Sequence, residues 1–298
     1  MTIADLVALA TRQLPRISGD PMHYMRPLKN VGILRQQRPT SFEATICDPV
    51  AIVILQGRKE MVLGGDCHPM TVGECLLVSH DLPVVARVRK TPYLALTFDI
   101  ELDTLRELYA TMADYPLPSA AQARSLGVQP CSALLLDAFR RCLALADSPM
   151  DAAVLGPLVS REIHYRLATA PFGGMLQHLI RRDSHASAIA RAIAQLRSDF
   201  RAPVEIPRLA RSVGMSASAF HKHFKAITAS SPLQYRKNLQ LLEARRLLRA
   251  GAHSVTETAF DIGYESAAQF SRDYARKFAV SPKHDRLPLK VAQRSSSA

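Results

Sequence analysis

The sequence lacks the features that would place it in a membrane, in an export pathway or among disulfide-bonded proteins. It has no run of roughly 18 apolar residues, so no membrane-spanning helix is expected. The segment Met1–Val7 has no basic residue ahead of its apolar stretch, so no export signal is expected either. The five cysteines are odd in number and form no Cys-x-x-Cys pair, which argues against disulfides and a structural zinc site. We therefore expect a cytoplasmic protein with reduced thiols.

Motifs of catalysis and of nucleotide binding are also missing. The chain has no nucleophile elbow, P-loop or dinucleotide fingerprint. Its region of short apolar runs has no close His-x-His pair that could begin a metal site. The isolated candidates are His23, His68, His80 and Glu74, and His68 beside Pro69 is typical of a turn. We expect no catalytic residue, no metal and no cofactor, and thus a protein that is not an enzyme.

Net charge separates two parts of the 298-residue chain, which is long enough for two domains. Residues 1–173 hold 17 basic and 17 acidic residues, so this part is neutral. Residues 174–298 hold 21 basic and 9 acidic residues and carry the whole net charge of +12. A basic domain joined to a neutral one is typical of proteins that bind a polyanion. A membrane surface would attract the same charge, so charge alone leaves the partner open.

Short apolar runs separated by turn residues characterise residues 21–103. Because no helical period lies between the runs, they predict an all-β barrel or sandwich. The predicted strands are Ala51–Leu55, Glu60–Leu63, Cys75–Val78, Val84–Val88 and Tyr93–Phe98. Residues 1–20, ahead of this region, are expected to form a leader helix.

Apolar residues at helical spacing follow in residues 104–175, with prolines at the boundaries. Helices are predicted over Asp103–Tyr115, Ser132–Asp147 and Ala152–Thr169. They form a helical linker, and Ser132–Thr169 is our candidate for the interface of a homodimer. A second group of helices is expected in residues 186–290, followed by a frayed tail over residues 291–298.

Two stretches of the basic part, residues 209–216 and 258–265, resemble each other at a fixed offset. The offset is 49 residues up to the turn and 50 residues after it, through one extra residue. The aligned pairs are Ala210 with Ala259, Gly214 with Gly263, Phe220 with Phe270, Phe224 with Tyr274, and Ser231-Pro232 with Ser281-Pro282. The same structural unit therefore occurs twice.

Each copy has the residue types that a helix-turn-helix needs. The small alanine lets two helices cross closely, and the glycine adopts the left-handed conformation that ends the first helix. A polar residue, Ser216 or the Glu265-Ser266 pair, then begins a second helix. Aromatic residues four positions apart face the core and turn the positions between them outward. The two units are predicted at about residues 206–228 and 255–278, within an all-α domain.

The outward positions of the second helices carry side chains suited to base edges and phosphates in the major groove of DNA. The predicted DNA contacts are Ser216, Ala217, Ser218, His221, Lys222, Lys225, Ser266, Ala267, Gln269, Arg272, Arg276 and Lys277. Between the copies, Leu233–Leu248 is predicted to be a rigid connector helix. Its apolar stripe is Leu239, Leu242, Ala244 and Leu247, with Arg236, Lys237, Arg245 and Arg246 beside it. Helices held apart in this way can enter successive major-groove turns, roughly 34 Å apart.

These motifs resemble a known family of proteins. Gly263-Tyr264-Glu265-Ser266, Gln269-Phe270-Ser271-Arg272, Phe278 and Ser281-Pro282 resemble the signature of AraC/XylS-type regulators. The stretch Met215–Lys225 resembles the family's first motif. The sequence departs from the family at Ala229 and Ala279, where glycine is usual, and at His284, where an aromatic or basic residue is usual. Alanine at these two helix ends is expected to weaken a cap by roughly 1 kcal/mol.

The N-terminal part resembles a partner domain of the same family. The matching segments are Asp48-Pro49, Leu55–Lys59, Gly73–Val78, Leu82–Val84 and Pro92–Leu96. The resemblance implies a cupin-like domain that binds an effector or dimerises, with a bacterial transcription regulator as the whole. The expected fold class is α+β, with a cupin-like β-barrel, a helical linker and a C-terminal all-α domain that holds both helix-turn-helix motifs. The expected partners are double-stranded promoter DNA, a second copy of the chain and a small-molecule effector; RNA polymerase is a further candidate.

Two other functions compete with this interpretation. A cupin-type metal enzyme fused to a DNA-binding module would purify with bound metal. A basic protein that binds RNA or anionic lipid would show no preference among DNA sequences. Cys67 and Cys75 could act as redox sensors if they were thiolates, but we expect both to be buried, inert thiols. Arg58-Lys59 fits an acidic effector or an ordinary pair of charges at a hairpin end, and the effector site is left unassigned.

Overall fold

The computed structural model describes residues 2–14, 22–118, 125–181, 183–251 and 253–286. The chain folds into two compact units. The first is built from residues 1–191 and 219–230, and the second from residues 192–218 and 231–298. Within the described ranges, no helix is both long and apolar enough to cross a bilayer. The predicted tail, residues 291–298, lies outside these ranges.

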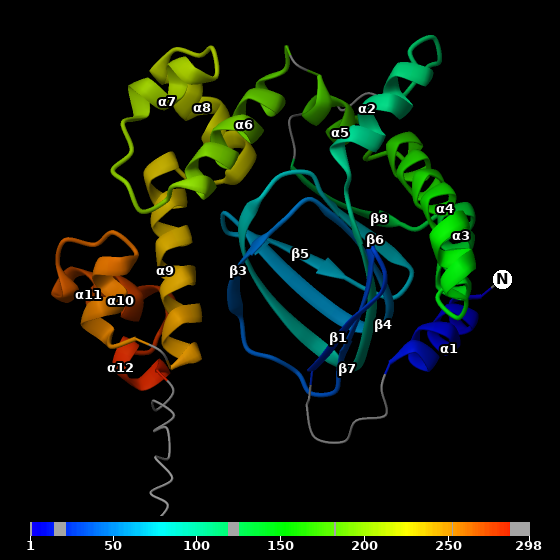
Figure 1. Ribbon diagram of the computed structural model, residues 1–298, viewed down its shortest axis with the longest axis horizontal. Helices are drawn as coiled ribbons and strands as arrows, with labels where there is room; N and C mark the ends of the chain where they lie inside the picture. The colour runs from blue at the N-terminus through cyan, green and yellow to red at the C-terminus, as the bar shows by residue number, and fades with distance from the viewer. Residues whose placement is uncertain (1, 15–21, 119–124, 182, 252, 287–298) are drawn as a thin grey trace, which may run out of the picture. The chain divides into compact units, whose positions relative to one another are not determined.

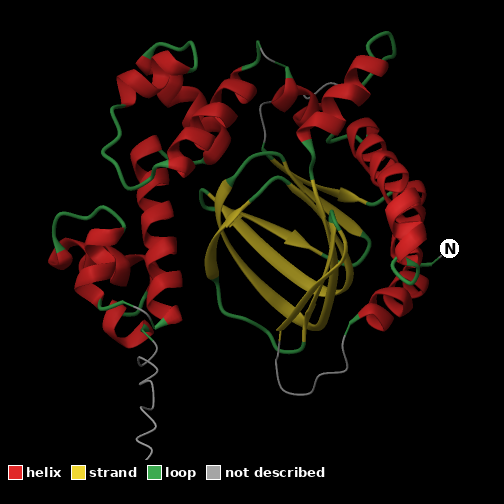
Figure 2. Ribbon diagram, viewed as in Figure 1, coloured by secondary structure: helices red, strands yellow, loops and turns green. Residues whose placement is uncertain are grey.

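One antiparallel sheet forms the centre of the first unit (Figure 1). Its strands are β1 (Met22–Leu28), β2 (Val31–Gln36), β3 (Glu43–Cys47), β4 (Val50–Leu63), β5 (Asp66–Met70), β6 (Glu74–Val78), β7 (Leu82–Asp99) and β8 (Leu126–Pro130). The pairing order is β1-β2-β7-β4-β6-β8, while β3 pairs with β7 and β5 with β4. The sheet is strongly curved (Figure 2). Its pairing path ends at β1 and β8, so closure into a barrel stays a prediction.

Two strands continue through positions where the sequence predicts breaks. The predicted strands at 51–55 and 60–63 are one strand, β4, and those at 84–88 and 93–98 are one strand, β7. Gly57 has a φ of +80°, and the register between β4 and β7 shifts between Ile54 and Lys59. Such bulges bend a strand and increase its twist without ending it. The glycine at this site therefore marks a bend within the sheet rather than a turn.

The two faces of the sheet bury separate apolar clusters, because successive side chains of a strand point to opposite faces. One face, which includes Val53, Leu96 and Phe98, packs against the first helices of the chain. These helices are α1 (Ile3–Gln13), α2 (Leu102–Thr111), α3 (Ala133–Leu145), α4 (Pro149–Thr169) and α5 (Gly174–Ile180). The opposite face buries Ile54 and Tyr93 together with further apolar residues.

The segment 104–175 is not wholly helical. The three predicted helices are present as α2, α3 and α4, but strand β8 lies between α2 and α3. It pairs with β6, from Leu126 opposite Val78 to Pro130 opposite Glu74. Five residues that include a glycine and a proline show no clear period, which is why the sequence pattern does not predict this strand. The linker thus contributes to the sheet.

Helices alone follow β8 in the described chain. After α5 they are α6 (His185–Ser198), α7 (Ile206–Ser212), α8 (Ala217–Thr228), α9 (Pro232–Ala250), α10 (Val255–Asp261), α11 (Ala267–Phe278) and α12 (Pro282–Asp285). The connector α9 buries Leu239 and Ala244 as predicted, but its remaining stripe differs. Leu241 and Leu248 are buried, whereas Leu242 and Leu247 are half-buried. The buried stripe differs because α9 also packs against α10, α11 and α12, which cover a second side of the helix.

Candidate nucleic-acid interface

The first helix of each copy ends in the same turn. Gly214 and Gly263 adopt φ values of +78° and +84°, in the left-handed region that favours glycine. The N–H of the next residue donates 2.9 Å back to the alanine carbonyl in both copies, Met215 to Ala210 and Tyr264 to Ala259. The backbone of Arg201 also approaches Gly263 so closely that a Cβ would lie 2.3 Å from its carbonyl oxygen. The sequence repeat is therefore also a repeat of backbone geometry.

The second helix of each copy buries its aromatic pair. Phe220 and Phe224 on α8 are fully buried, with ring centroids 5.4 Å apart. Phe270 and Tyr274 on α11 are also fully buried, with centroids 5.5 Å apart. Both helices contain 12 residues. The aromatic side of each helix thus faces a core, and the opposite side is left for contacts with a partner.

The predicted contact residues lie on these opposite sides, with two exceptions. Ten of them are exposed: Ser216, Ala217, Ser218, His221, Lys222, Lys225, Ser266, Gln269, Arg272 and Arg276. Ser266 is also the N-cap of α11, where its hydroxyl accepts a hydrogen bond from the Gln269 N–H at 3.3 Å. Ala267 is half-buried against the core around Phe270. Its side chain is therefore only partly available for a contact.

Lys277 is the second exception. It follows Phe270 by seven residues, which is nearly two full helical turns, so it lies on the core side of α11. Its Nζ donates to Asn238 Oδ1 of α9 at 2.8 Å. Burial lowers the pKa of this ammonium. Lys277 is predicted to point outward together with Arg276, but the structure turns the two side chains in different directions, so this prediction was wrong for Lys277.

A buried carboxylate joins α11 to α9. Asp273 is 5% exposed, and its Oδ2 lies 2.5 Å from Lys237 Nζ and accepts from the Tyr264 hydroxyl at 3.3 Å. Arg276 pairs with the other oxygen. Burial opposes the charge on Asp273, but the contact with Lys237 and the nearby Arg276 keep the pKa of this carboxyl below its usual value. Asp273 therefore fixes the second helix-turn-helix to the connector.

Other basic residues of α9 have structural partners. Arg236 donates to the carbonyls of Phe200 and Arg201, both at 2.9 Å. Arg245 lies 2.8 Å from Asp285, which also accepts from the Tyr274 hydroxyl at 2.8 Å. Arg246 pairs with Glu243 within the helix. Much of the positive charge beside the predicted stripe thus holds the helices together.

A polar hollow lies between α9 and α11, with a volume of about 630 Å³. Its lining residues are Gln234, Lys237, Asn238, Arg276 and Lys277. Sequence analysis did not assign a contact to Gln234 or Asn238, and it placed Lys237 only beside the connector's stripe. The hollow joins residues that are about 40 positions apart in the chain, so no local pattern could have indicated it.

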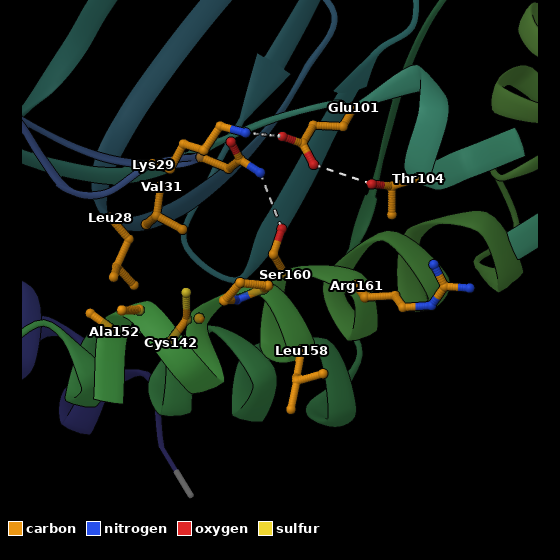
Figure 3. Close-up of a pocket in the computed structure, with 14 residues that line it drawn as sticks. Leu28, Lys29, Val31, Glu101, Thr104, Cys142, Ala152, Leu158, Ser160 and Arg161 are labelled. Carbon is orange, nitrogen blue, oxygen red and sulfur yellow. Dashed lines mark hydrogen bonds and ion pairs between the residues drawn. The ribbon is translucent and has the colours of Figure 1, made fainter. Parts of the chain in front are cut away.

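The first unit has a separate cavity of about 480 Å³ beside α4 (Figure 3). Its lining mixes polar and apolar groups. Lys29 Nζ lies 3.0 Å from Glu101, and Asn30 donates to the Ser160 hydroxyl at 3.2 Å. The lining also includes apolar and small residues: Leu28, Val31, Ala153, Gly156 and Pro157. Pro157 has no N–H, so the Ala153 carbonyl lacks its regular helical donor and can accept from a guest molecule.

His164 anchors α4 next to this cavity. Its ring is fully buried, and Nε2 accepts a hydrogen bond from the Glu101 N–H at 2.9 Å. Because Nε2 accepts, the proton lies on Nδ1, which donates to the Ser160 carbonyl at 2.9 Å. Burial lowers the pKa of this imidazole and keeps it neutral. The cavity wall is thus held in a defined position.

His80, Glu74 and Cys75 occupy structural positions, and His68 lies within strand β5 opposite Met61, so the prediction of a turn at His68 was wrong. His80 is buried between Ser79 and the Ala186 carbonyl, and burial lowers its pKa to about 4. Glu74 accepts from the backbone and hydroxyl of Thr71. Cys75 is buried beside Cys131, and their contact together with burial raises its pKa, which suits an inert thiol. Cys67 is exposed, so for this residue the expectation of a buried thiol was wrong.

Comparison with known families matches both parts of the chain. The profile of the family described as "AraC-type transcriptional regulator N-terminus" matches residues 27–175, which is half of the chain. A profile described as "Helix-turn-helix domain" matches residues 209–287. A likeness to a ToxT variant from Vibrio cholerae in its apo form has a TM-score of 0.58 at 11% identity. It covers 90% of this chain and 98% of that one, and at this identity it shows the fold alone.

Curated relatives carry the names of regulators. The "HTH-type transcriptional regulator CdhR" of Pseudomonas aeruginosa is 29% identical over 149 residues, which are 49% of this chain and 42% of CdhR. The "HTH-type transcriptional activator RhaS" of Salmonella schwarzengrund is 28% identical over 156 residues, which are 50% of this chain and 53% of RhaS. The chain thus spans about half the length of the curated relatives it matches. Together with the match over residues 27–175, the repeated helix-turn-helix shows that the chain belongs to the AraC/XylS family of transcriptional regulators.

Proposed function

We propose that the protein regulates transcription by binding a specific sequence in double-stranded DNA with both helix-turn-helix units. The observation that carries this proposal is the identical turn at Gly214 and Gly263, each followed by a 12-residue helix with an exposed polar side. Base edges in the major groove would be contacted by His221 of α8 and by Gln269 and Arg272 of α11. The net charge of +12, all of it from residues 174–298, supports attraction to the phosphate backbone.

Selection of bound duplexes from a random DNA pool tests this function. We expect two conserved blocks whose centres are separated by about one helical turn, roughly 10 base pairs. Selection at moderate salt favours base contacts over general attraction to phosphate. If no sequence is enriched, the proposal is contradicted. The protein would then be a general polyanion binder, such as one that binds RNA or anionic lipid.

We further propose that residues 21–103 form a cupin-like barrel to which residues 104–175, otherwise a helical linker, contribute strand β8, that residues 186–290 form the DNA-binding domain, and that the protein has no catalytic role. The names of the curated relatives as transcriptional regulators support a non-enzymatic function. A small molecule would control DNA binding, and the cavity beside α4 is its proposed site. Its size and its mixture of polar and apolar lining residues suit a small amphipathic compound. Such a compound would shift the protein between conformations only if it binds one of them more tightly.

A filled cavity provides the test of effector binding. A Cβ on Gly156 would meet no atom within 4 Å, and Gly156 lines the cavity, so Gly156→Leu is the variant expected to fill it. Gly156→Ala is the matched control, because it leaves most of the volume open. In a thermal-shift screen of metabolites, effectors should stabilise the wild type and Gly156→Ala but not Gly156→Leu. A compound that stabilises all three proteins equally binds elsewhere, and such a result for every active compound would contradict this site.

We also propose that the protein is a homodimer that pairs through α4. Met150, Val154 and Leu158 lie at intervals of four residues and are 73%, 63% and 63% exposed. This spacing places them on one side of the helix, where a second copy would cover them. Val154→Glu should therefore shift the protein to monomer in sedimentation experiments, whereas Val72→Glu, at an exposed site in a different turn, should not. A dimer that persists in Val154→Glu would assign the interface to another surface.

A further inference from the structure

The hollow between α9 and α11 has an excess of positive charge. Lys237 and Arg276 share a single carboxylate, that of Asp273. Lys277 adds a third cation, and among the described residues it has no carboxylate partner within ion-pair distance; its Nζ bonds only to the neutral Asn238 amide. Three cations and one anion leave this small volume with a surplus of two positive charges. Arg276 is 73% exposed, so water can solvate its charge, but a half-buried cation such as Lys277 is normally paired, and its charge indicates a site for an anion.

The neutral side chains of the hollow are also suited to an anion. Gln234 and Asn238 lie one turn apart on α9, and the Gln234 amide donates toward Asn238 Oδ1 at 3.4 Å. Lys277 donates to the same oxygen, so the Asn238 amide N–H groups remain to bind a guest. Ammonium, guanidinium and amide groups supply several donors within one volume. A tetrahedral phosphate, whose oxygens accept several hydrogen bonds, matches this set.

The hollow is continuous with the surface that we propose to contact bases. Gln269, Arg272 and Arg276 lie at spacings of three and four residues, so they form one stripe along α11. Arg276 ends this stripe and also lines the hollow. When Gln269 and Arg272 enter a major groove, the sugar-phosphate backbone at the edge of that groove comes to the hollow. The position of the site therefore fits a phosphate of the bound duplex.

We infer that Lys237, Lys277, Gln234 and Asn238 form a clamp for one backbone phosphate of the DNA, an inference that rests on the proposed function. The clamp assigns a DNA contact to the connector helix itself. It also places the DNA contact of Lys277 beside the connector helix, whereas the sequence predicts this contact on the outward side of α11. Because phosphate contacts fix the register of a protein on DNA without distinguishing sequences, the clamp sets affinity and alignment rather than base preference.

The dependence of affinity on salt tests the clamp in the full-length protein. Lys277→Gln should lower the slope of log Kd against log salt concentration by about 1 and weaken binding by about tenfold at 0.1 M salt, roughly the loss of one phosphate contact. The sequence selected from a random pool should stay the same. Arg246→Gln is the charge-matched control, because Arg246 lies nine residues after Lys237 and so on the opposite side of α9. Its slope should equal that of the wild type.

A second measurement locates the phosphate and separates it from a free ion. Single neutral methylphosphonate linkages, placed in turn along the selected duplex, should weaken wild-type binding at one linkage beside the block contacted by α11. The same linkage should have no effect on Lys277→Gln, because the charge that it removes no longer has a partner. Lys237→Gln removes a partner of buried Asp273, so its thermal melting must be checked, whereas Lys277→Gln leaves no buried carboxylate unpaired.

The outcomes distinguish failure of the clamp from failure of the proposed function. If Lys277→Gln keeps the wild-type slope, or if every methylphosphonate weakens both proteins equally, the clamp does not bind DNA. A thermal shift by inorganic phosphate that is lost in Lys277→Gln, together with an unchanged DNA slope, would assign the hollow to a free anion and overturn the inference. Absence of any preferred duplex for the wild type would overturn the proposed function instead.

Discussion

The two helix-turn-helix copies share their turns and aromatic cores but differ in how their second helices are held. On α11, Asp273 is buried and pairs with Lys237 of the connector. The equivalent position on α8, 50 residues earlier, is His223, which is half-buried and stacks on His185 with ring centroids 3.7 Å apart. An ion pair within the second copy is thus replaced by a contact between two stacked rings in the first. The repeat preserves the scaffold, while the anchoring of each recognition helix is specific to its copy.

Loss of the shared aromatic core should affect both copies equally and should have the largest effect. Phe220→Ala and Phe270→Ala each remove a fully buried ring, and each should lower the free energy of unfolding by about 4 kcal/mol. Urea denaturation followed by circular dichroism measures both changes. A difference of more than about 2 kcal/mol between the two variants would show that the copies do not share an equivalent core.

Loss of the anchors should affect the copies unequally. Asp273→Ala leaves Lys237 without its partner in a partly buried site, so we expect a loss of about 3 kcal/mol in unfolding free energy. His223→Ala removes a half-buried neutral ring and should cost about 1 kcal/mol. Asp273→Asn, which retains a hydrogen bond to Tyr264, should fall between them. Equal losses for Asp273→Ala and His223→Ala would remove the distinction between the copies.

Because of these anchors, the stabilities of the two copies should respond differently to pH. Burial and the nearby His185 lower the pKa of His223 below 6.5, so the unfolded chain takes up this proton more readily than the folded one. The contribution of neutral His223 to the stability of the folded state is therefore complete above pH 6.5 and is lost as the pH falls below 6.5. For Asp273, whose pKa lies below 3.8 in the folded state, the stabilisation is complete above 3.8 and lost only below it. Amide hydrogen exchange at pH 7.5 and 5.5 should therefore show weaker protection of α8, but not of α11, at the lower pH. His223→Gln should reduce the difference, and the part that remains should come from His80 and His164, whose pKa values burial also lowers.

The smallest expected effect concerns the residues that end the second helices. Ala229 and Ala279 adopt φ values of +54° and +55°, which cost an alanine about 1 kcal/mol relative to glycine. Ala229→Gly and Ala279→Gly should each raise the melting temperature by a few degrees. Ala275→Gly, within α11, is the control and should lower it. A fall in melting temperature for either cap variant would contradict this assignment of strain.

Local signals explain which parts of the fold the sequence predicts. Gly214, Gly263 and the aromatic pairs act within a few residues of their own positions, so spacing alone indicates both the turns and the buried sides of α8 and α11. Gly57 is also a local signal, but a bulge and a turn both use glycine, and only the pairing of β4 with β7 distinguishes them. Strand β8 depends on its partner β6 rather than on its own pattern.

The candidate site shows the same limit. Exposure of Arg272 follows from helical period, because Arg272 lies opposite the buried aromatic pair of α11, whereas His221 is exposed although it lies beside its aromatic pair. The inward direction of Lys277 also follows from its seven-residue spacing to Phe270, a signal that composition obscured. The partnership of Asp273 with Lys237 joins residues 36 positions apart, and it requires the packing of α11 on α9. Long-range contacts of this kind, including the polar hollow, are visible only in the folded chain.

The most direct test of the account is selection from a random duplex pool with the wild type, Arg272→Ala and His221→Ala in parallel. The account predicts two conserved blocks about one helical turn apart for the wild type. Arg272→Ala should relax one block and His221→Ala the other, with a loss of about 1 to 3 kcal/mol in discrimination at the affected bases. Relaxation of the same block by both substitutions, or enrichment of no sequence by the wild type, would contradict DNA recognition by two separate helix-turn-helix units.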